Sequence, residues 1–242
     1  MYAIQTKNLS KKYGHITAVE NLTLGIKKGE IFSLLGVNGA GKTTLIKMLS
    51  CITKPTSGEA VILGNSIIDD SEKIKNFIGV SPQQSAIAPN LSVKENLMLI
   101  AGIHGLTKRK QKKKVEELSI KFGLEEILDR RASHLSGGWQ RRLSIAMALI
   151  NEPEVIFLDE PTLGLDVIAR SELWNVIRSL KGKNTVILTT HYMEEAEALS
   201  DRIGIMKNGK LLTTGTATEL KKQTGTDKFE DAFITLVTEV KI

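Results

Sequence analysis

Apolar and polar positions follow two different spacings along the chain, which predict strands and helices. Apolar runs at residues 31–35, 60–63, 77–80, 155–158 and 185–190 predict strands, and residues 2–35 are β-rich overall. Between residues 92 and 123, apolar side chains such as Val93, Leu97 and Ile100 recur every three or four positions, which predicts helices. Residues 141–150 and 168–180 also have a helical pattern. The unbroken run 155–158 fits a central parallel strand that is covered on both faces.

The last part of the chain predicts a hairpin followed by two short helices. Residues 202–207 and 210–214 flank Asn208-Gly209, a dipeptide typical of a type I′ turn. Residues 216–242 have the pattern of two helices interrupted at Gly225.

A glycine-rich loop carries the clearest chemistry. Residues 36–44 read GVNGAGKTT and lie between the apolar run 31–35 and the helical residues 45–49, with the pattern G-x-x-x-x-G-K-[ST]. The glycines let several backbone N–H groups point at one phosphate chain, and the helix adds the positive end of its dipole. Lys42 can reach the outer phosphates, and Thr43 offers a hydroxyl to Mg²⁺. The loop therefore predicts a nucleoside triphosphate site, with contacts from Asn38, Gly39, Ala40, Gly41, Lys42, Thr43 and Thr44.

Two acids follow the apolar run 155–158, at the strand end where α/β sheets place their ligands. We expect Asp159 to hold Mg²⁺ directly or through water. We expect Glu160 to act as general base toward the attacking water, a role worth roughly 10²–10⁴ in rate. His191 ends the strand 185–190, where it could reach a γ-phosphate. The alternative, two solvated acids at a strand end, is disfavoured because a phosphate loop lies upstream.

Three further signals are weaker. Ser136-Gly137-Gly138 precedes a helix and offers N–H groups and a hydroxyl to an anion, but Ser and Gly also cap helices that bind nothing. Tyr13, in a polar loop, is either an uninformative exposed residue or a ring that stacks on a base for ~1–3 kcal/mol. The basic run 108–114 contains no aromatic residues, which favours a solvated helix start over a surface for nucleic acid or acidic lipid.

Composition sets wide limits on the function. The chain has 242 residues, of which 41% are hydrophobic and 25% charged, as in a globular protein with a full core. Its net charge of +6 permits a nucleic-acid or membrane-surface partner without arguing for one. Cys51 is the only cysteine, so no internal disulfide can form, and the four histidines lack metal-ligand spacing. We expect no signal peptide, because residues 1–7 lack a basic and then apolar stretch. We expect no transmembrane segment, because the longest apolar run, 145–150, is far below the ~20 residues needed.

In combination, these pieces resemble the ATP-binding subunit of an ABC transporter over residues 2–220. The matching motifs are Walker A (36–44), the Q-loop glutamine (Gln83), the ABC signature (135–140), Walker B with its catalytic glutamate (155–160), the D-loop (165–166), the switch histidine (His191) and the aromatic residue that stacks on adenine (Tyr13). One position departs from the family pattern, because the fifth signature residue, commonly Gln, is Trp139 here. The Ser136-Gly137-Gly138 part that touches phosphate is intact, so we expect activity to survive.

The resemblance implies an α/β fold with three parts. A P-loop NTPase (RecA-like) core with a parallel sheet and an N-terminal antiparallel β region would span residues 1–83 and 152–220. An inserted helical subdomain, residues 84–151, would carry the signature, and residues 221–242 would form a C-terminal tail. Together they would make a single ATP-binding domain over residues 1–242.

The resemblance also implies the cofactors and the role of each site residue. ATP and Mg²⁺ would bind, with Glu160, His191 and Gln83 as the catalytic residues. The Mg²⁺ ligands would be Thr43, Gln83 and Asp159, and Val19 would join Tyr13 and the phosphate loop among the nucleotide contacts. Ser136, Gly137 and Gly138 would contact the ATP held by a second ATP-binding subunit, a copy of this chain, in a head-to-tail dimer.

The implied partner is a separate multi-span transmembrane permease, which would hold the chain at the cytoplasmic face of the membrane. Residues 208–221 and 229–236 are similar to exporters of the daunorubicin-resistance and multidrug kind, which implies outward transport of a drug-like or other small substrate. Residues 92–105 are the candidate docking surface, with ordinary packing inside the domain as the alternative. The alternative function is an ABC ATPase of a soluble machine in translation, DNA repair or iron–sulfur assembly. We expect no nucleic-acid partner.

Overall fold

The centre of the protein is a six-stranded sheet that is parallel except at one edge. A computed structural model describes residues 1–239 and gives the strand order β10-β9-β3-β8-β7-β6. All neighbouring pairs are parallel except the β9–β10 hairpin. The strand bounds are β3 Ile31–Leu35, β6 Ile78–Ser81, β7 Val155–Asp159, β8 Thr185–Thr190, β9 Arg202–Lys207 and β10 Lys210–Gly215. The residues of β3, β7 and β8 are all buried, which is why these strands read as unbroken apolar runs.

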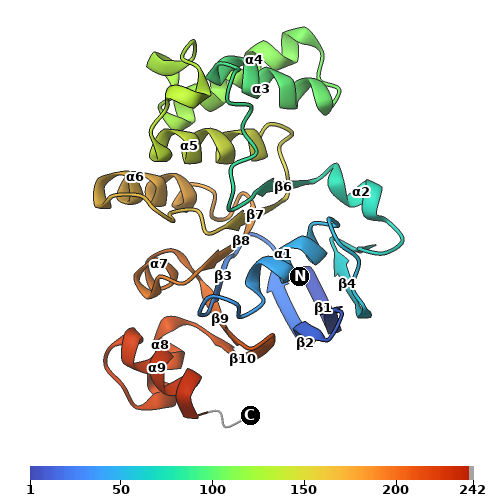
Figure 1. Cartoon of the computed structure of the whole chain (residues 1–242), viewed down its shortest axis with the longest axis vertical. Helices are drawn as coiled ribbons and strands as arrows, with labels where there is room; N and C mark the ends of the chain where they lie inside the picture. The colour runs from blue at the N-terminus through green and yellow to red at the C-terminus, as the bar shows by residue number, and fades with distance from the viewer. Residues whose placement is uncertain (240–242) are drawn as a thin grey trace.

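A second, antiparallel sheet forms the N-terminal β region. Its order is β2-β1-β4-β5, with β1 at Tyr2–Tyr13, β2 at Ile16–Lys27, β4 at Ser57–Ile62 and β5 at Asn65–Ser66. Helix α1, Lys42–Leu49, packs between the two sheets, and Leu45 and Met48 share one core with Ile4 of β1 and Phe157 of β7 (Figure 1). The short helix α2, Ser71–Lys75, leads into β6.

Helices gather at one end of the molecule, next to the outer strands β6 and β7 (Figure 1). They are α3 Val93–Ile103, α4 Lys108–Phe122 and α5 Gly137–Ala148, with short 3-10 turns η1 Glu125–Ile127 and η2 Ala132–His134 between the last two. Their core is continuous with α6, Val167–Arg178, and with one face of the sheet. The helical pattern of residues 92–123 is confirmed as two helices. Helix α5 begins at Gly137, four residues before the predicted start. The apolar pattern missed the first turn because glycines have no apolar side chain. The subdomain boundaries at residues 84 and 151 stay a prediction.

The C-terminal part follows the sequence pattern closely. Asn208 and Gly209 both have positive φ angles, 48° and 79°, as a type I′ turn requires. Helices α8, Ala217–Thr224, and α9, Phe229–Glu239, are separated by Gly225 in a left-handed C-cap. They pack with α7, Met193–Leu199, on β9. The predicted helical pattern for residues 240–242 lies outside the described residues.

The expectation that Tyr13 lies in a loop is wrong. Tyr13 is the last residue of β1 and pairs with Ile16 of β2. The strand was hard to see in the sequence because its pairing with β2 shifts register several times and Asn8 has a φ of 49°. Such bulges break the two-residue alternation on which strand recognition depends.

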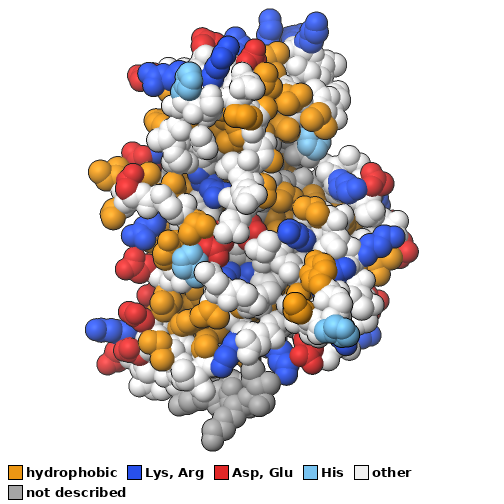
Figure 2. All heavy atoms as spheres, in the orientation of Figure 1, with side chains coloured by type: hydrophobic (Ala, Val, Ile, Leu, Met, Phe, Trp, Pro, Cys, Tyr) orange, Lys and Arg blue, Asp and Glu red, His pale blue; other side chains and the backbone are white. Residues whose placement is uncertain are grey.

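Charged side chains of both signs are interspersed over the visible face of the molecule (Figure 2). The basic run is part of the first half of α4, where Lys114 pairs with Glu117 at 2.7 Å and Glu152 at 2.5 Å. Among residues 1–239, no helix combines the length and the apolar character that crossing a bilayer would need.

Candidate functional site

The phosphate loop connects β3 to α1 and depends on glycine at two positions. A Cβ on Gly36 would lie 2.4 Å from the Met206 carbonyl oxygen, and one on Gly41 would lie 2.3 Å from that of Ala18. Gly41 also has a φ of 101°, a left-handed conformation that favours glycine. Within the described chain, no side chain caps the start of α1. The first N–H groups of the helix are therefore free to bind an anion.

A cavity of about 570 Å³ lies over this loop. Residues 38–44 line it together with residues from four distant segments, namely Ile16, Thr17, Ala18, Gln83, Glu160 and Asn208. The hairpin turn reaches the site because the Gly209 N–H donates to the Ala40 carbonyl at 3.0 Å. The sequence did not single out Asn208 or the start of β2 as cavity residues, since a turn signal and a strand pattern carry no information about distant neighbours.

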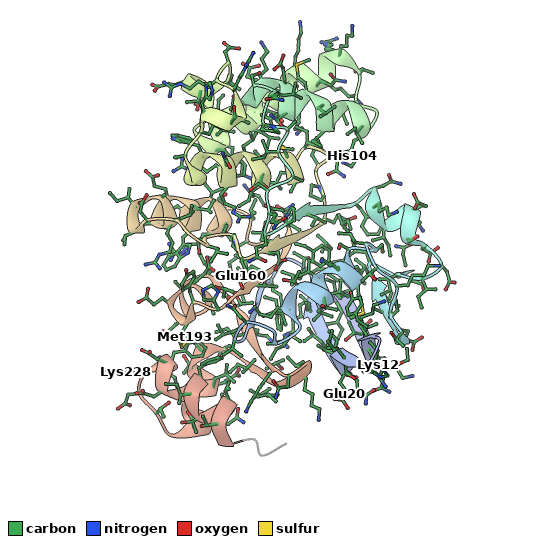
Figure 3. The ribbon with its side chains drawn as sticks, viewed as in Figure 1. Lys12, Glu20, His104, Glu160, Met193 and Lys228 are labelled. Atoms are coloured by element: carbon green, nitrogen blue, oxygen red, sulfur yellow. The ribbon has the colours of Figure 1, made fainter. Side chains whose placement is uncertain are left out.

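Glu160 contacts both Lys42 and His191 and lies near the middle of the molecule, where β7 ends (Figure 3). Its Oε1 lies 3.4 Å from Lys42 Nζ, and its Oε2 lies 2.6 Å from His191 Nδ1. Lys42 also donates to the Gly36 carbonyl at 2.7 Å. Glu160 has a φ of 51°, and its N–H donates to Thr189 Oγ1 at 3.0 Å. A left-handed conformation is uncommon for Glu and is frequent at functional sites, where the surroundings stabilise it.

Oxygen atoms suited to Mg²⁺ converge beside Glu160. Asp159 Oδ1 accepts hydrogen bonds from Thr43 Oγ1 at 3.1 Å and from Thr189 Oγ1 at 2.5 Å. Residues 1–239 contain no group of three or more His, Cys, Asp or Glu residues that could hold a metal on their own. One carboxylate and one hydroxyl beside a phosphate site fit Mg²⁺, which is usually held by one or two protein oxygens, waters and substrate phosphates. Gln83 is exposed and lines the same cavity.

Other predicted nucleotide contacts lie around or outside the cavity. Tyr13 is 47% exposed at the tip of the β1–β2 hairpin, with Lys11 Nζ 5.0 Å from the centre of its ring. It pairs with Ile16, which lines the cavity. Val19 is fully buried in the core and is absent from the cavity wall, where its neighbour Ala18 is present.

Ser136, Gly137 and Gly138 are not part of this cavity. Ser136 is the exposed N-cap of α5, and its side chain makes no capping hydrogen bond within the described chain. The start of α5 therefore has N–H groups that are free to bind an anion. The unusual Trp139 stacks against Arg142, whose Cζ lies 4.7 Å from the ring centre. Trp139 packs against the helical core, so its bulk does not cover Ser136.

A buried carboxyl group behind the site was missed in the sequence. Glu195 of α7 is fully buried and accepts hydrogen bonds from Thr162 Oγ1 at 2.8 Å and Trp174 Nε1 at 3.1 Å. Its Oε2 has no partner among the described residues. Burial raises the pKa of Glu195 above its ordinary value, and the polar groups of Thr190, Thr162 and Trp174 around it oppose this rise. A glutamate on a short helix gives no sequence signal of such an environment.

Comparison with known proteins identifies the family. The family model for the ABC transporter matches residues 19–163, which is more than half of the chain. The probable multidrug ABC transporter ATP-binding protein YbhF of Escherichia coli (strain K12) is 41% identical over 240 residues. This match covers 97% of the present chain but 41% of that protein. The daunorubicin resistance ATP-binding protein DrrA3 of Streptomyces coeruleorubidus is 40% identical over 229 residues, covering 94% of this chain and 72% of DrrA3.

Solved structures show the same fold. The ATP-binding subunit of an ABC transporter superimposes with a TM-score of 0.86 at 29% identity, over 97% of this chain and 99% of the other. A dimeric post-hydrolysis state of the ATP-binding cassette MJ0796, bound to ADP and Pi, gives a TM-score of 0.81 at 31% identity over 88% of this chain and 98% of the other. The predicted α/β fold class is confirmed.

Proposed function

Since the chain belongs to the ABC transporter family and is an ATP-hydrolysing cassette, we propose that it is the motor subunit of an exporter. In this proposal, Mg-ATP binding closes a dimer and hydrolysis opens it, and a separate permease uses the movement. The observation that carries the proposal is the position of Glu160, between Lys42 of the phosphate loop and His191 at the end of β8. This arrangement of a carboxylate, a cation and an imidazole supports a γ-phosphate site between them.

The nucleotide would bind along the loop of residues 38–44, with backbone N–H groups and Lys42 on its phosphates. Bound Mg²⁺ would supply charge neutralisation on the β- and γ-phosphate oxygens. Thr43, Asp159 and Gln83 are the residues that would hold it. Tyr13 would stack on adenine at the mouth of the cavity, on the side that Ile16 lines. Val19 would support this wall of the cavity from beneath without touching the nucleotide, because its own side chain is buried.

Hydrolysis would use Glu160 as general base and His191 as its partner. Glu160 would accept a proton as the oxygen of water bonds to the γ-phosphorus, and the bond from that phosphorus to the β–γ bridging oxygen breaks, so ADP leaves with the electron pair. His191 would hold the Glu160 carboxylate through its Nδ1 and present its other ring nitrogen toward the γ-phosphate.

The second half of each site would come from a second copy of the chain. Ser136, Gly137 and Gly138 are available for an anion and lie outside the cavity of their own chain. A head-to-tail pair would bring them to the γ-phosphate held by the partner. The dimeric MJ0796 cassette supports this arrangement by its similarity.

The names of the relatives support the proposed permease and direction of transport. YbhF and DrrA3 are described as ATP-binding proteins of multidrug transport and daunorubicin resistance. We propose that this chain acts in the same way at the cytoplasmic face of a membrane, through a permease, on a drug-like or other small substrate. Leu99 and Ile103 of α3 are exposed, the latter by 70%, and favour the segment 92–105 as the docking surface. The soluble-machine alternative has no supporting relative among those described above.

Two experiments test the proposal. Glu160→Gln keeps the shape of the side chain but accepts a proton poorly, so the variant should accumulate as an ATP-bound dimer with little turnover. Hydrolysis near the parent rate would remove Glu160 from the role of base.

Purification of the chain from its own cells in mild detergent should recover a multi-span membrane protein in stoichiometric amount. Recovery of ribosomal, repair or assembly proteins alone would leave the ATPase standing and overturn the transporter role.

A further inference from the structure

The segment that carries Gln83 has little main-chain structure of its own. Residues 82–88 form neither helix nor strand. Within residues 1–239, the backbone of residues 83–87 makes no hydrogen bond to another backbone group. The position of Gln83 must therefore come from other contacts, since a chain without internal hydrogen bonds does not fix itself.

Side chains of the helices α3 and α5 hold both ends of this segment. Arg141 of α5 donates from Nη1 to the Pro82 carbonyl at 2.8 Å and from Nη2 to the Gln83 carbonyl at 2.9 Å. At the other end, Asn96 of α3 accepts from the Ala88 N–H at 2.8 Å and donates to the Ala88 carbonyl at 3.1 Å. Asn96 is fully buried and Arg141 is only 6% exposed, so water competes little for these hydrogen bonds.

Helix α5 is also fixed to β6, the strand that leads into the segment. A Cβ on Gly79 would lie 2.0 Å from the Ala148 carbonyl oxygen, which shows how closely the two elements approach. One turn earlier on α5, Ser144 and Ser81 share a hydrogen bond of 2.8 Å. Arg141 follows about one further turn toward the start of α5, opposite Pro82. Ser136 is the N-cap of the same helix, so one helix connects the Ser136 end to Gln83.

The charge of Arg141 suits this position. Burial lowers the pKa of Arg141, while the carboxylates Asp159, Glu160 and Glu195 oppose that change. Arginine stays charged under physiological conditions, and its planar fork can serve two neighbouring carbonyls at once. Lysine, with a single point-like ammonium group, cannot reproduce this geometry.

We propose that Arg141 is a positioning residue of ATP hydrolysis, which fixes the main chain at Pro82 and Gln83 to helix α5. Gln83 and the Ser136 end of α5 then move as one unit, so that closure of a dimer at Ser136 moves the Gln83 side chain, which already lines the cavity, against the bound nucleotide. This inference rests on the proposed role of Gln83 as a Mg²⁺ and γ-phosphate contact. Arg141 itself touches neither the nucleotide cavity nor its loop.

The test compares variants of the full chain in two measurements, kcat for ATP and the Mg²⁺ concentration that gives half-maximal activity. Gln83→Ala is the reference. Arg141→Met removes both hydrogen bonds, and Arg141→Lys keeps the charge without the fork. Arg202→Met is the matched control, because Arg202 is a partly buried arginine that donates to the Gly25 carbonyl at 3.1 Å, away from the cavity.

We expect Gln83→Ala to lower kcat and raise the Mg²⁺ requirement. Arg141→Met should shift both in the same direction, with a loss in kcat of about 10-fold to 100-fold, because a small displacement of a positioned group has effects of this size. Arg141→Lys should fall between Arg141→Met and the parent, and Arg202→Met should stay within about 2-fold of the parent. The double variant of Arg141→Met and Gln83→Ala should lose no more kcat than Gln83→Ala alone, since both changes act on the Gln83 side chain.

The affinity for ADP checks folding, because ADP lacks the γ-phosphate and should bind all variants within about 2-fold. If Arg141→Met fails to bind ADP, it has not folded correctly, and the kcat and Mg²⁺ requirement of Arg141→Lys are compared with the parent instead. A shifted Mg²⁺ requirement in Gln83→Ala together with parent behaviour of the Arg141 variants would overturn the inference and leave the proposed function intact. An unchanged Mg²⁺ requirement in Gln83→Ala would overturn the proposed role of Gln83 and the inference with it.

Discussion

The ion pair between Lys42 and Glu160 should compete with nucleotide binding. Both side chains are almost fully buried, with exposed fractions of 5% and 7%, and their charged atoms lie 3.4 Å apart. At an effective dielectric constant of about 20, two unit charges at this distance attract by about 5 kcal/mol. Desolvation offsets most of this attraction in a buried pair, which leaves a net value of roughly 1–2 kcal/mol. A phosphate that recruits Lys42 must weaken this pair.

Glu160→Gln removes the competing charge, so it should tighten nucleotide binding to the single chain by about 5-fold to 30-fold, the ratio for 1–2 kcal/mol. ADP is the right probe, because we expect Lys42 to reach the β-phosphate. ADP would also not support the ATP-bound dimer, which would tighten binding by another route. The dissociation constant of ADP is measured by calorimetry for the parent, Glu160→Gln, Lys42→Met and the double variant. In the Lys42→Met background, the gain from Glu160→Gln should largely disappear.

Glu72→Gln serves as the control for loss of one negative charge. Glu72 pairs with Lys75 at 2.7 Å on the surface, so its removal should leave ADP affinity unchanged. Equal ADP affinity of Glu160→Gln and the parent would refute the competition. An equal gain with and without Lys42 would assign the effect to general repulsion between Glu160 and the phosphates.

Two predictions concern stability. Glu195→Gln should raise Tm at pH 8. Burial holds the pKa of Glu195 in the folded protein above the ordinary 4.5, so the parent protein loses stability as the pH rises through the folded pKa. Below pH 4.5 the difference in Tm between the variant and the parent should vanish. A Tm difference that does not change with pH would contradict this reasoning. Gly79→Ala should destabilise by about 1–3 kcal/mol in urea unfolding, because the new Cβ would meet the Ala148 carbonyl oxygen at 2.0 Å. Gly102→Ala is the control, since its Cβ would meet its nearest neighbour at 3.7 Å.

The parts of the site that sequence predicts well are those whose geometry is set locally. The phosphate loop needs glycine at Gly36 and Gly41 for steric reasons that are visible in the spacing itself. Buried strands such as β7 read as unbroken apolar runs because both of their faces are covered. The position of Asp159 and Glu160 then follows, since ligands bind at the carboxyl ends of such strands.

The parts that sequence does not predict depend on contacts between distant segments. Arg141 and the two carbonyls that it binds are 58 and 59 residues apart, and each looks ordinary by itself. From sequence, an arginine near the start of a helix is predicted to be exposed to solvent, and a main-chain carbonyl has no sequence signature at all. Tyr13 was misplaced for a related reason, because the bulges of β1 are stabilised by β2 and leave no regular pattern.

These contacts divide the reaction between two structural units. Lys42, Thr43 and Glu160 line one cavity, and Asp159 is hydrogen-bonded to Thr43 beside it. These side chains are already paired with one another or with main chain, so binding would exchange existing partners for phosphate and Mg²⁺. The main chain of Gln83 belongs instead to the helical side, through Arg141. If Gln83 has its proposed role, we therefore expect nucleotide binding to proceed with the helices in any position and hydrolysis to require that they approach. Under the proposed function, such a division would let the chain hold ATP without hydrolysing it until the dimer has closed.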